Sequence, residues 1–196
     1  MIMDITESIN DTRKGFEESF ATGDFYNRQT QDSEHLKRIL EFVKISEGID
    51  FPFAADSFDL IVTRYALHHF PDIEHSIGAV SRVLKSGGML FISDPCPNEC
   101  DTERFIDDYM RLKKDGHIKF YTKDECFDIC SRKGLIAVDS FDSSIRFPQK
   151  KETAYGYEEV LKKHDKAVID SYDLLETDTE LYLTEQVNNI MFEKMG

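Results

Sequence analysis

From Phe58 onward, short apolar runs alternate with stretches in which an apolar residue recurs at every third or fourth position. The runs FDLIVTR (58–64) and GMLFISD (88–94) have the length and composition of buried strands. The stretch between them carries a helical stripe formed by Ile73, Ile77, Val80 and Leu84. Asp72 can cap this helix, and the glycines of SGG can end it. Strands that alternate with helices of this length build a mostly parallel sheet, so the fold class is predicted to be α/β.

The C-terminal half continues the alternation. A helix is predicted over ERFIDDYMRLKK (103–114), and the capping-box sequence TKDE (122–125) opens another that ends near Gly134. LIAVDSFDSSIRF (135–147) predicts a strand, and the polar stretch 153–171 predicts a helix. Two further strands are predicted over ELYLT (180–184) and NNIMFEKM (188–195), and one strand near the C-terminus is expected to be antiparallel.

The length of 196 residues suggests one domain. Residues 1–31 are predicted to form a flexible, partly helical N-terminal segment, residues 32–147 the core, and residues 148–196 a C-terminal helix and strands. The net charge of −14 argues against nucleic acid and anionic membranes as partners. No apolar run approaches the roughly 18 residues of a membrane span, and no export signal is visible, so we expect a cytoplasmic protein.

The four cysteines occur in two pairs, CPNEC (96–100) and CFDIC (126–130). Four thiolates at this spacing can hold zinc, but the second pair lies on a predicted helix, where Cys126 and Cys130 share an apolar face. Small buried cysteines explain that pair equally well, and we predict no metal site.

Three segments carry a family resemblance, and they follow one another in the order IDFPFAADSFDLIVTRYALHHFPD (49–72), AVSRVLKSGGMLFISDP (79–95) and IKFYTKDECFDICSRKGL (118–135). They resemble the adenine loop with the fourth strand, the next helix with the fifth strand, and the helix before the sixth strand of class I S-adenosylmethionine-dependent methyltransferases. Within this class, the three segments resemble the ubiquinone/menaquinone-biosynthesis-like enzymes, which are also called the methyltransferase type 11 group. The resemblance covers roughly residues 32–147. It implies a Rossmann-like sheet with helices on both faces and a small-molecule methyl acceptor.

One part of the family pattern is missing. Members of this family bind the cofactor on a G-x-G-x-G loop after their first strand, where glycines let the backbone approach the ligand. No G-x-G occurs in this sequence, and only seventeen residues, Glu41–Ser57, separate the predicted helix HLKRIL from FDLIVTR. Three strand–helix units need about 60 residues or more. We therefore predict a truncated sheet that lacks the first strands and the glycine loop.

The resemblance places the remaining cofactor-binding residues at Glu47, Gly48, Thr63, Arg64 and Tyr65. Glu47 corresponds to the family's acid at the adenine amino group, and Gly48 to the backbone N–H at the ring. The alternative is an ordinary loop with a solvated carboxylate. Arg64 can equally pair with surface acid.

Three residues at the expected ligand edge are candidates for chemistry. His68 and His69 can serve as a general base, since a histidine pKa lies near neutrality. The alternative is that one histidine packs or caps the turn while the other is solvated. Asp94 lies where a substrate can be met, or it caps the next turn, as the sequence DP favours. Many methyl transfers need only proximity, so a catalytic residue is not required.

Two functions follow from these observations. The first is an S-adenosylmethionine-dependent methyltransferase that acts on a small molecule. The second is a non-catalytic remnant of the fold that acts as a binding or dimerisation module. Loss of the first strands leaves FDLIVTR as an apolar sheet edge, so a homodimer joined through that edge, or aggregation, is expected.

Overall fold

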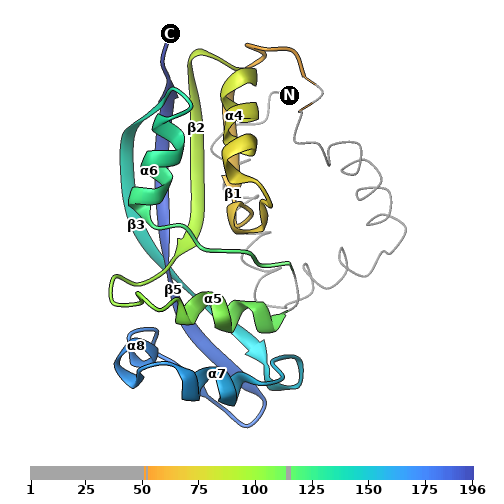
Figure 1. The fold of residues 1–196 in the computed structure, drawn as a ribbon, viewed down its shortest axis with the longest axis vertical. Helices are drawn as coiled ribbons and strands as arrows, with labels where there is room; N and C mark the ends of the chain where they lie inside the picture. The colour runs from red at the N-terminus through yellow and green to blue at the C-terminus, as the bar shows by residue number, and fades with distance from the viewer. Residues whose placement is uncertain (1–50, 52, 114–115) are drawn as a thin grey trace, which may run out of the picture. The chain divides into compact units, whose positions relative to one another are not determined.

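The strands of the C-terminal three quarters of the chain form one mixed sheet (Figure 1). The computed structural model describes residue 51, residues 53–113 and residues 116–196, all within one of the two units of the chain, Ile49–Gly196. The strands are β1 (Phe58–Arg64), β2 (Leu84–Cys96), β3 (Leu135–Lys150), β4 (Leu175–Glu176) and β5 (Glu180–Lys194). Their order is β1-β2-β5-β3, and β4 pairs with β5.

The strand directions confirm the predicted sheet. β1 pairs with β2 in parallel, whereas β5 is antiparallel to each of its neighbours β2, β3 and β4. Hence β1 to β4 all run in one direction, and among the strands that the structure describes the C-terminal strand β5 alone runs against them. The carboxyl ends of β1 and β2 meet at one edge, as the α/β pattern requires.

Helices α4 (Ile73–Val83) and α6 (Lys123–Ser131) cover one row of sheet side chains. Their apolar stripes bury Ile77, Val80 and Ile129 against Leu90, Ile92, Ile190 and Phe192. Both predicted caps are confirmed, since Asp72 accepts from the backbone N–H of His75 and Thr122 forms a reciprocal capping box with Glu125. Gly134 has a φ of +75°, which suits a residue just after a helix.

Helices α5 (Phe105–Met110), α7 (Tyr157–Lys163) and α8 (Lys166–Asp170) gather around the other end of β5 (Figure 1). Phe105, Tyr109 and Ile169 pack there with Leu181 and Leu183. The register along β5 is continuous, so Leu181 and Leu183 belong to the side-chain row opposite that of Ile190 and Phe192. The two helix groups thus use opposite rows of one strand, which confirms helices on both faces. The described residues also contain three short 3₁₀ segments, η1 (Leu67–His69), η2 (Arg111–Lys113) and η3 (Lys151–Thr153).

Several predicted boundaries were wrong. SGG does not end α4 but forms an irregularity at the start of β2, where a Cβ on Gly88 would lie 2.8 Å from the carbonyl oxygen of Lys85. The two predicted closing strands are one strand, because residues 185–187 continue the ladder with β3. The predicted helix over 153–171 is interrupted at His164, where the backbone is extended. The predictions for residues 1–50, including the helix HLKRIL, lie outside the described residues.

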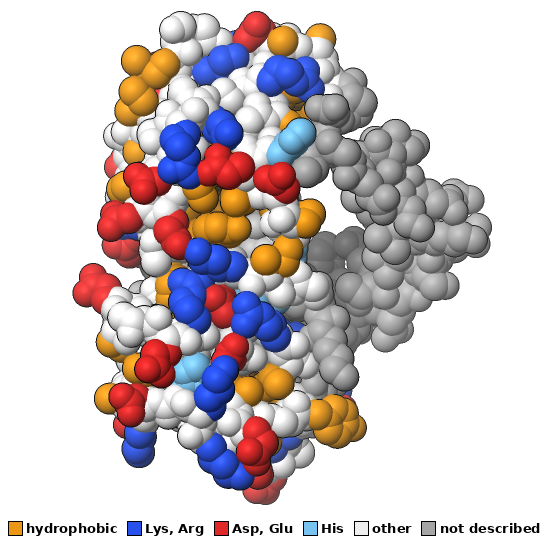
Figure 2. All heavy atoms as spheres, viewed as in Figure 1, with side chains coloured by type: hydrophobic (Ala, Val, Ile, Leu, Met, Phe, Trp, Pro, Cys, Tyr) orange, Lys and Arg blue, Asp and Glu red, His pale blue; other side chains and the backbone are white. Residues whose placement is uncertain are grey.

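The charged surface is mixed in sign. On the face shown in Figure 2, Lys and Arg side chains lie among Asp and Glu side chains. Exposed ion pairs such as Lys85–Asp59 and Lys166–Asp170 stabilise the fold by at most about 1 kcal/mol each. No helix in the described part of the chain is long and apolar enough to cross a membrane.

Candidate active site

Asp94 lies near the end of the buried part of β2 and organises the turn that follows β1. Its carboxylate accepts from the backbone N–H groups of Ala66 (2.9 Å), Leu67 (3.2 Å) and His68 (3.2 Å). The turn begins at Tyr65, whose φ of +51° lies in the left-handed region and whose N–H donates to the carbonyl oxygen of Ser93. Asp94 therefore caps the turn that follows β1. It does not cap the turn that comes next in the sequence, which the sequence DP had suggested.

The same carboxylate holds the imidazole of His68. Nδ1 of His68 lies 2.8 Å from Oδ2 of Asp94, and both residues are buried. A carboxylate in this position accepts from Nδ1, and a neutral imidazole bound in this way has its lone pair on Nε2. No group among the described residues hydrogen-bonds Nε2. An Asp–His pair in this arrangement is suited to remove a proton from a bound nucleophile.

Aromatic rings form the wall around His68. Its ring centroid lies 4.1 Å from that of His69, 5.4 Å from that of His117 and 5.0 Å from that of Phe120. The carbonyl oxygen of His68 also accepts from the N–H of Ile118 at 2.9 Å. The segment after η2 is thus fixed against the turn that carries the two candidate histidines. The Nδ1 atom of His69 is buried and has no partner among the described residues.

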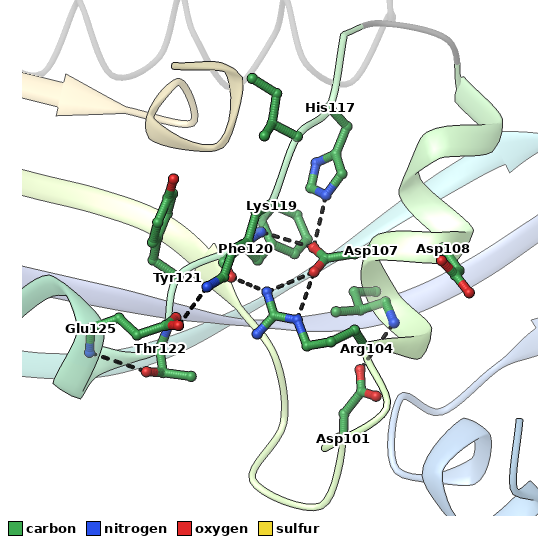
Figure 3. A network of polar contacts seen from close by, with 12 residues as sticks. Asp101, Arg104, Asp107, Asp108, His117, Lys119, Phe120, Tyr121, Thr122 and Glu125 are labelled. Atoms are coloured by element: carbon green, nitrogen blue, oxygen red, sulfur yellow. Dashed lines mark hydrogen bonds and ion pairs between the residues drawn. The ribbon is translucent and has the colours of Figure 1, made fainter. Parts of the chain in front are cut away.

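A second buried carboxylate, Asp107 on α5, holds this segment in place (Figure 3). It accepts from the backbone N–H of Phe120 (2.8 Å), from Nε2 of His117 (2.9 Å) and from Nε of Arg104 (2.7 Å). Burial alone would raise the pKa of Asp107, but the hydrogen bonds from His117 and Phe120 and the charge of Arg104 hold it below its ordinary value. Asp107 therefore remains ionised and positions the wall beside His68.

Sequence reasoning missed two polar groups near the same edge, Glu185 on β5 and Tyr109 on α5. Both are only 2% exposed. The hydroxyl of Tyr109 has no hydrogen-bond partner among the described residues. Burial raises the pKa of Glu185, although Lys113 and His68 partly offset it, and the charge of Glu185 adds to the burial that raises the pKa of Tyr109. The signal that could have drawn attention to Glu185 is its place between two strand-like runs, ELYLT and NNIMFEKM, which are close enough to form one strand.

The candidate cofactor-binding residues that the structure describes lie at the carboxyl end of β1. Thr63 Oγ1 is buried without a partner among the described residues, which makes it a polar atom fit to meet a ligand. The guanidinium of Arg64 lies 4.6 Å from the centroid of the Tyr65 ring. The sequence had offered pairing with a surface acid as the alternative role for Arg64. Glu47 and Gly48 lie outside the described residues.

The cysteines do not take part in the chemistry at this edge of the sheet. Cys126 and Cys130 are buried within the cluster of α4, α6 and the sheet, as the apolar face of the helix predicted. Burial raises the pKa of Cys130 to about 12 and that of Cys96 to about 11, so neither thiol is reactive near neutral pH. Among the described residues, no group of three or more His, Cys, Asp or Glu side chains is arranged to hold a metal.

The sheet order, the reversed C-terminal strand and the polar turn after β1 define a Rossmann-like methyltransferase fold. A family model described as a methyltransferase domain matches residues 7–140. The chain belongs to this family, and the resemblance to class I S-adenosylmethionine-dependent methyltransferases is confirmed.

Individual relatives agree with the family. The uncharacterized methyltransferase YcgJ of Bacillus subtilis is 35% identical over 83 residues, which is 41% of this chain and 33% of YcgJ. Its crystal structure superposes with a TM-score of 0.64 at 20% identity, covering 84% of this chain and 80% of that one. A candidate methyltransferase from Bacillus halodurans gives a TM-score of 0.67 at 18% identity, covering 76% and 75%.

A relative with a named acceptor is 27-O-demethylrifamycin SV methyltransferase of Amycolatopsis mediterranei, 35% identical over 65 residues, or 30% of this chain and 24% of that protein. By sequence, the chain therefore spans only a quarter to a third of YcgJ and of this enzyme. The structural superpositions cover more, but at these identities they show the fold alone.

Proposed function

We propose that this chain is an S-adenosylmethionine-dependent methyltransferase that acts on a small molecule, with His68 as the general base. The observation that carries the proposal is the 2.8 Å bond between Nδ1 of His68 and Asp94, which leaves Nε2 as an acceptor at the carboxyl ends of β1 and β2. Ligands of parallel α/β sheets bind at this edge. Support for a small acceptor comes from the rifamycin relative, whose name specifies such a substrate.

The residues have separable tasks in this proposal. Nε2 of His68 accepts the proton of the acceptor's hydroxyl or amine as that atom becomes the nucleophile. Asp94 fixes the tautomer and orientation of the ring and stabilises the imidazolium that forms, as the acid of a catalytic triad does. The rings of His69 and Phe120 shield the pair from water. Asp107 acts through His117 and Phe120, so it is a positioning residue.

The cofactor is S-adenosylmethionine by family, and it supplies an electrophilic methyl group when bound. The fit of the described residues is partial. Thr63 offers an unpartnered buried hydroxyl near the carboxyl end of β1, and the left-handed turn at Tyr65 follows it. The chain contains no G-x-G sequence for the methionine end of the cofactor. We therefore assign only Thr63, Arg64 and Tyr65, with Glu47 and Gly48 retained from the sequence.

A second function is favoured by that missing glycine loop. In this alternative the chain is a non-catalytic module of the methyltransferase fold, and the polar edge binds a ligand or nothing. Both alternatives are consistent with the same fold, because a fold does not specify activity.

Calorimetric titration of the full chain with S-adenosylmethionine and S-adenosylhomocysteine separates the two. Dissociation constants in the micromolar range, weakened at least tenfold by Thr63→Val, would support the enzyme. Thr63→Ser is the matched control, because it keeps the hydroxyl. An absence of heat at millimolar ligand, from protein that circular dichroism shows to be folded, would support the non-catalytic module.

A further inference from the structure

The sheet ends at two strands that differ in how well they are protected from pairing with another chain. In the part of the chain that the structure describes, β1 pairs only with β2, and β3 pairs only with β5. An open edge offers unpaired backbone groups to any strand that can reach them. Proteins protect such edges with bulges, prolines and charges.

β3 carries all three protections. Its register is interrupted between Ala137 and Asp139, it contains Pro148, and charged side chains recur at Asp139, Asp142, Arg146 and Lys150. β1 has no proline, its register is uninterrupted from Leu60 to Arg64 although it shifts between Phe58 and Leu60, and its charged residues are Asp59 and Arg64 alone. The side chains of Leu60 and Val62 are 53% and 57% exposed, in the middle of a seven-residue strand. β1 is therefore the edge that is open to association.

The exposed pair continues an apolar surface onto β2. The ladder places Leu60 beside Met89 and Val62 beside Phe91 on β2, and these two residues lie beside Glu193 and Met191 on β5. Residues paired in register project from the same side of a sheet. A partner at this edge would therefore cover Leu60 and Val62, whose neighbours on β2 are both apolar.

We propose that two copies of this chain associate through β1 in antiparallel orientation, which joins their sheets into one. Full overlap of the seven residues places the two-fold axis at Ile61. Leu60 then lies opposite Val62 of the second copy, Phe58 opposite its Arg64, and Asp59 opposite its Thr63. No like charges face each other, and the two apolar pairs cover the exposed row. The strand is thus self-complementary, and this is why the occupant is a second copy.

This arrangement places the candidate active site at the interface. In an antiparallel pair, the carboxyl end of one β1 lies beside the amino end of the other. Arg64 and Tyr65 of one copy therefore lie near Phe58 of the second copy. The dimer itself does not depend on methyltransferase activity, since its argument uses only the edge and its side chains.

Sedimentation velocity on the full chain from about 1 to 100 µM tests the association, a range that matches moderate protein affinities. The wild type is expected to sediment as a dimer at the upper end. Val62→Lys should raise the dissociation constant at least tenfold. Phe141→Lys is the matched control, because Phe141 is 60% exposed on the protected edge β3, and it should leave the dimer intact. A wild type that stays monomeric, or equal effects of the two variants, would overturn the proposal.

The register has its own test. The Leu60→Glu variant and the Val62→Lys variant should each be monomeric when measured alone. A mixture of the two should form heterodimers, because position 60 of one copy lies opposite position 62 of the other and the two introduced charges are opposite in sign. Dissociation of the mixture would overturn the antiparallel register centred on Ile61. Amide exchange in β1, but not in β3, should slow as protein concentration rises, which distinguishes edge pairing from association elsewhere.

Discussion

Replacement of Asp94 by Asn tests the interaction that defines the candidate site. The carboxylate is 4% exposed and receives four hydrogen bonds, three from backbone N–H groups and one from Nδ1 of His68. Asparagine keeps one oxygen, which can serve the N–H groups of Ala66 and Leu67. Its amide nitrogen then faces the N–H of His68, so one charge-assisted bond is lost outright and the others lose their ionic component.

The expected loss follows from these contacts. One hydrogen bond to a buried charged acceptor is worth about 1.5–3 kcal/mol, and the two remaining bonds weaken to neutral strength. We therefore expect Asp94→Asn to lower the free energy of unfolding by about 2–4 kcal/mol. Urea denaturation followed by circular dichroism measures it. Asp72→Asn is the control, because Asn caps a helix as well as Asp does, and the change there should stay below about 0.5 kcal/mol.

The same substitution also changes the tautomer of His68. The side-chain N–H₂ that Asp94→Asn introduces would donate to Nδ1, which moves the ring proton to Nε2 and removes the lone pair that the proposed base needs. Nitrogen-15 NMR of the imidazole reports the tautomer without cofactor or acceptor. A stability loss below about 0.5 kcal/mol, or an Nδ1-protonated ring in the variant, would refute the reasoning.

Two further substitutions test the fold around the site. Burial raises the pKa of Glu185 above its ordinary value of 4.5, so its contribution to stability is complete below that pH and is lost as pH rises through the folded pKa. Glu185→Gln should therefore show a smaller fall of Tm between about pH 4 and pH 8 than the wild type, and an identical pH dependence would contradict the assignment. Thr122→Ala removes the capping box of α6 and should lower the unfolding free energy by about 1 kcal/mol, whereas Thr122→Ser should restore most of it in the same urea assay.

The parts of the fold that sequence predicted are those that local chemistry determines. Asp72, Thr122 and Gly134 act within one helical turn of their position, so their roles are visible in the sequence. Alternation of apolar runs with helical stripes was enough to place β1, α4 and α6. The irregularity of β2 at Lys85–Gly88 could not be predicted from the sequence. A glycine pair after a helical stripe is equally compatible with the end of a helix and with a distorted strand.

The site was only half visible for a different reason. His68 and Asp94 were each candidates, but they are 26 residues apart, and only the parallel pairing of β1 with β2 brings them together. Glu185 was missed because an acid between two apolar runs suggests a break, and a break is what the sequence predicted there. The continuous ladder of β5 instead carries this acid into the core.

The distribution of hydrogen-bonding partners favours a ligand at this edge. Asp94 and Asp107 are buried and are each satisfied by three or more donors, as structural carboxylates should be. The hydroxyls of Thr63 and Tyr109 are buried without a partner among the described residues, and each such group destabilises the fold by about 1–3 kcal/mol. A module retained only for its fold would be more stable with Val and Phe at these positions. Unsatisfied groups near a satisfied Asp–His pair are instead what a binding site requires before its ligand arrives, and this asymmetry favours a ligand at this edge in either of the two proposed functions.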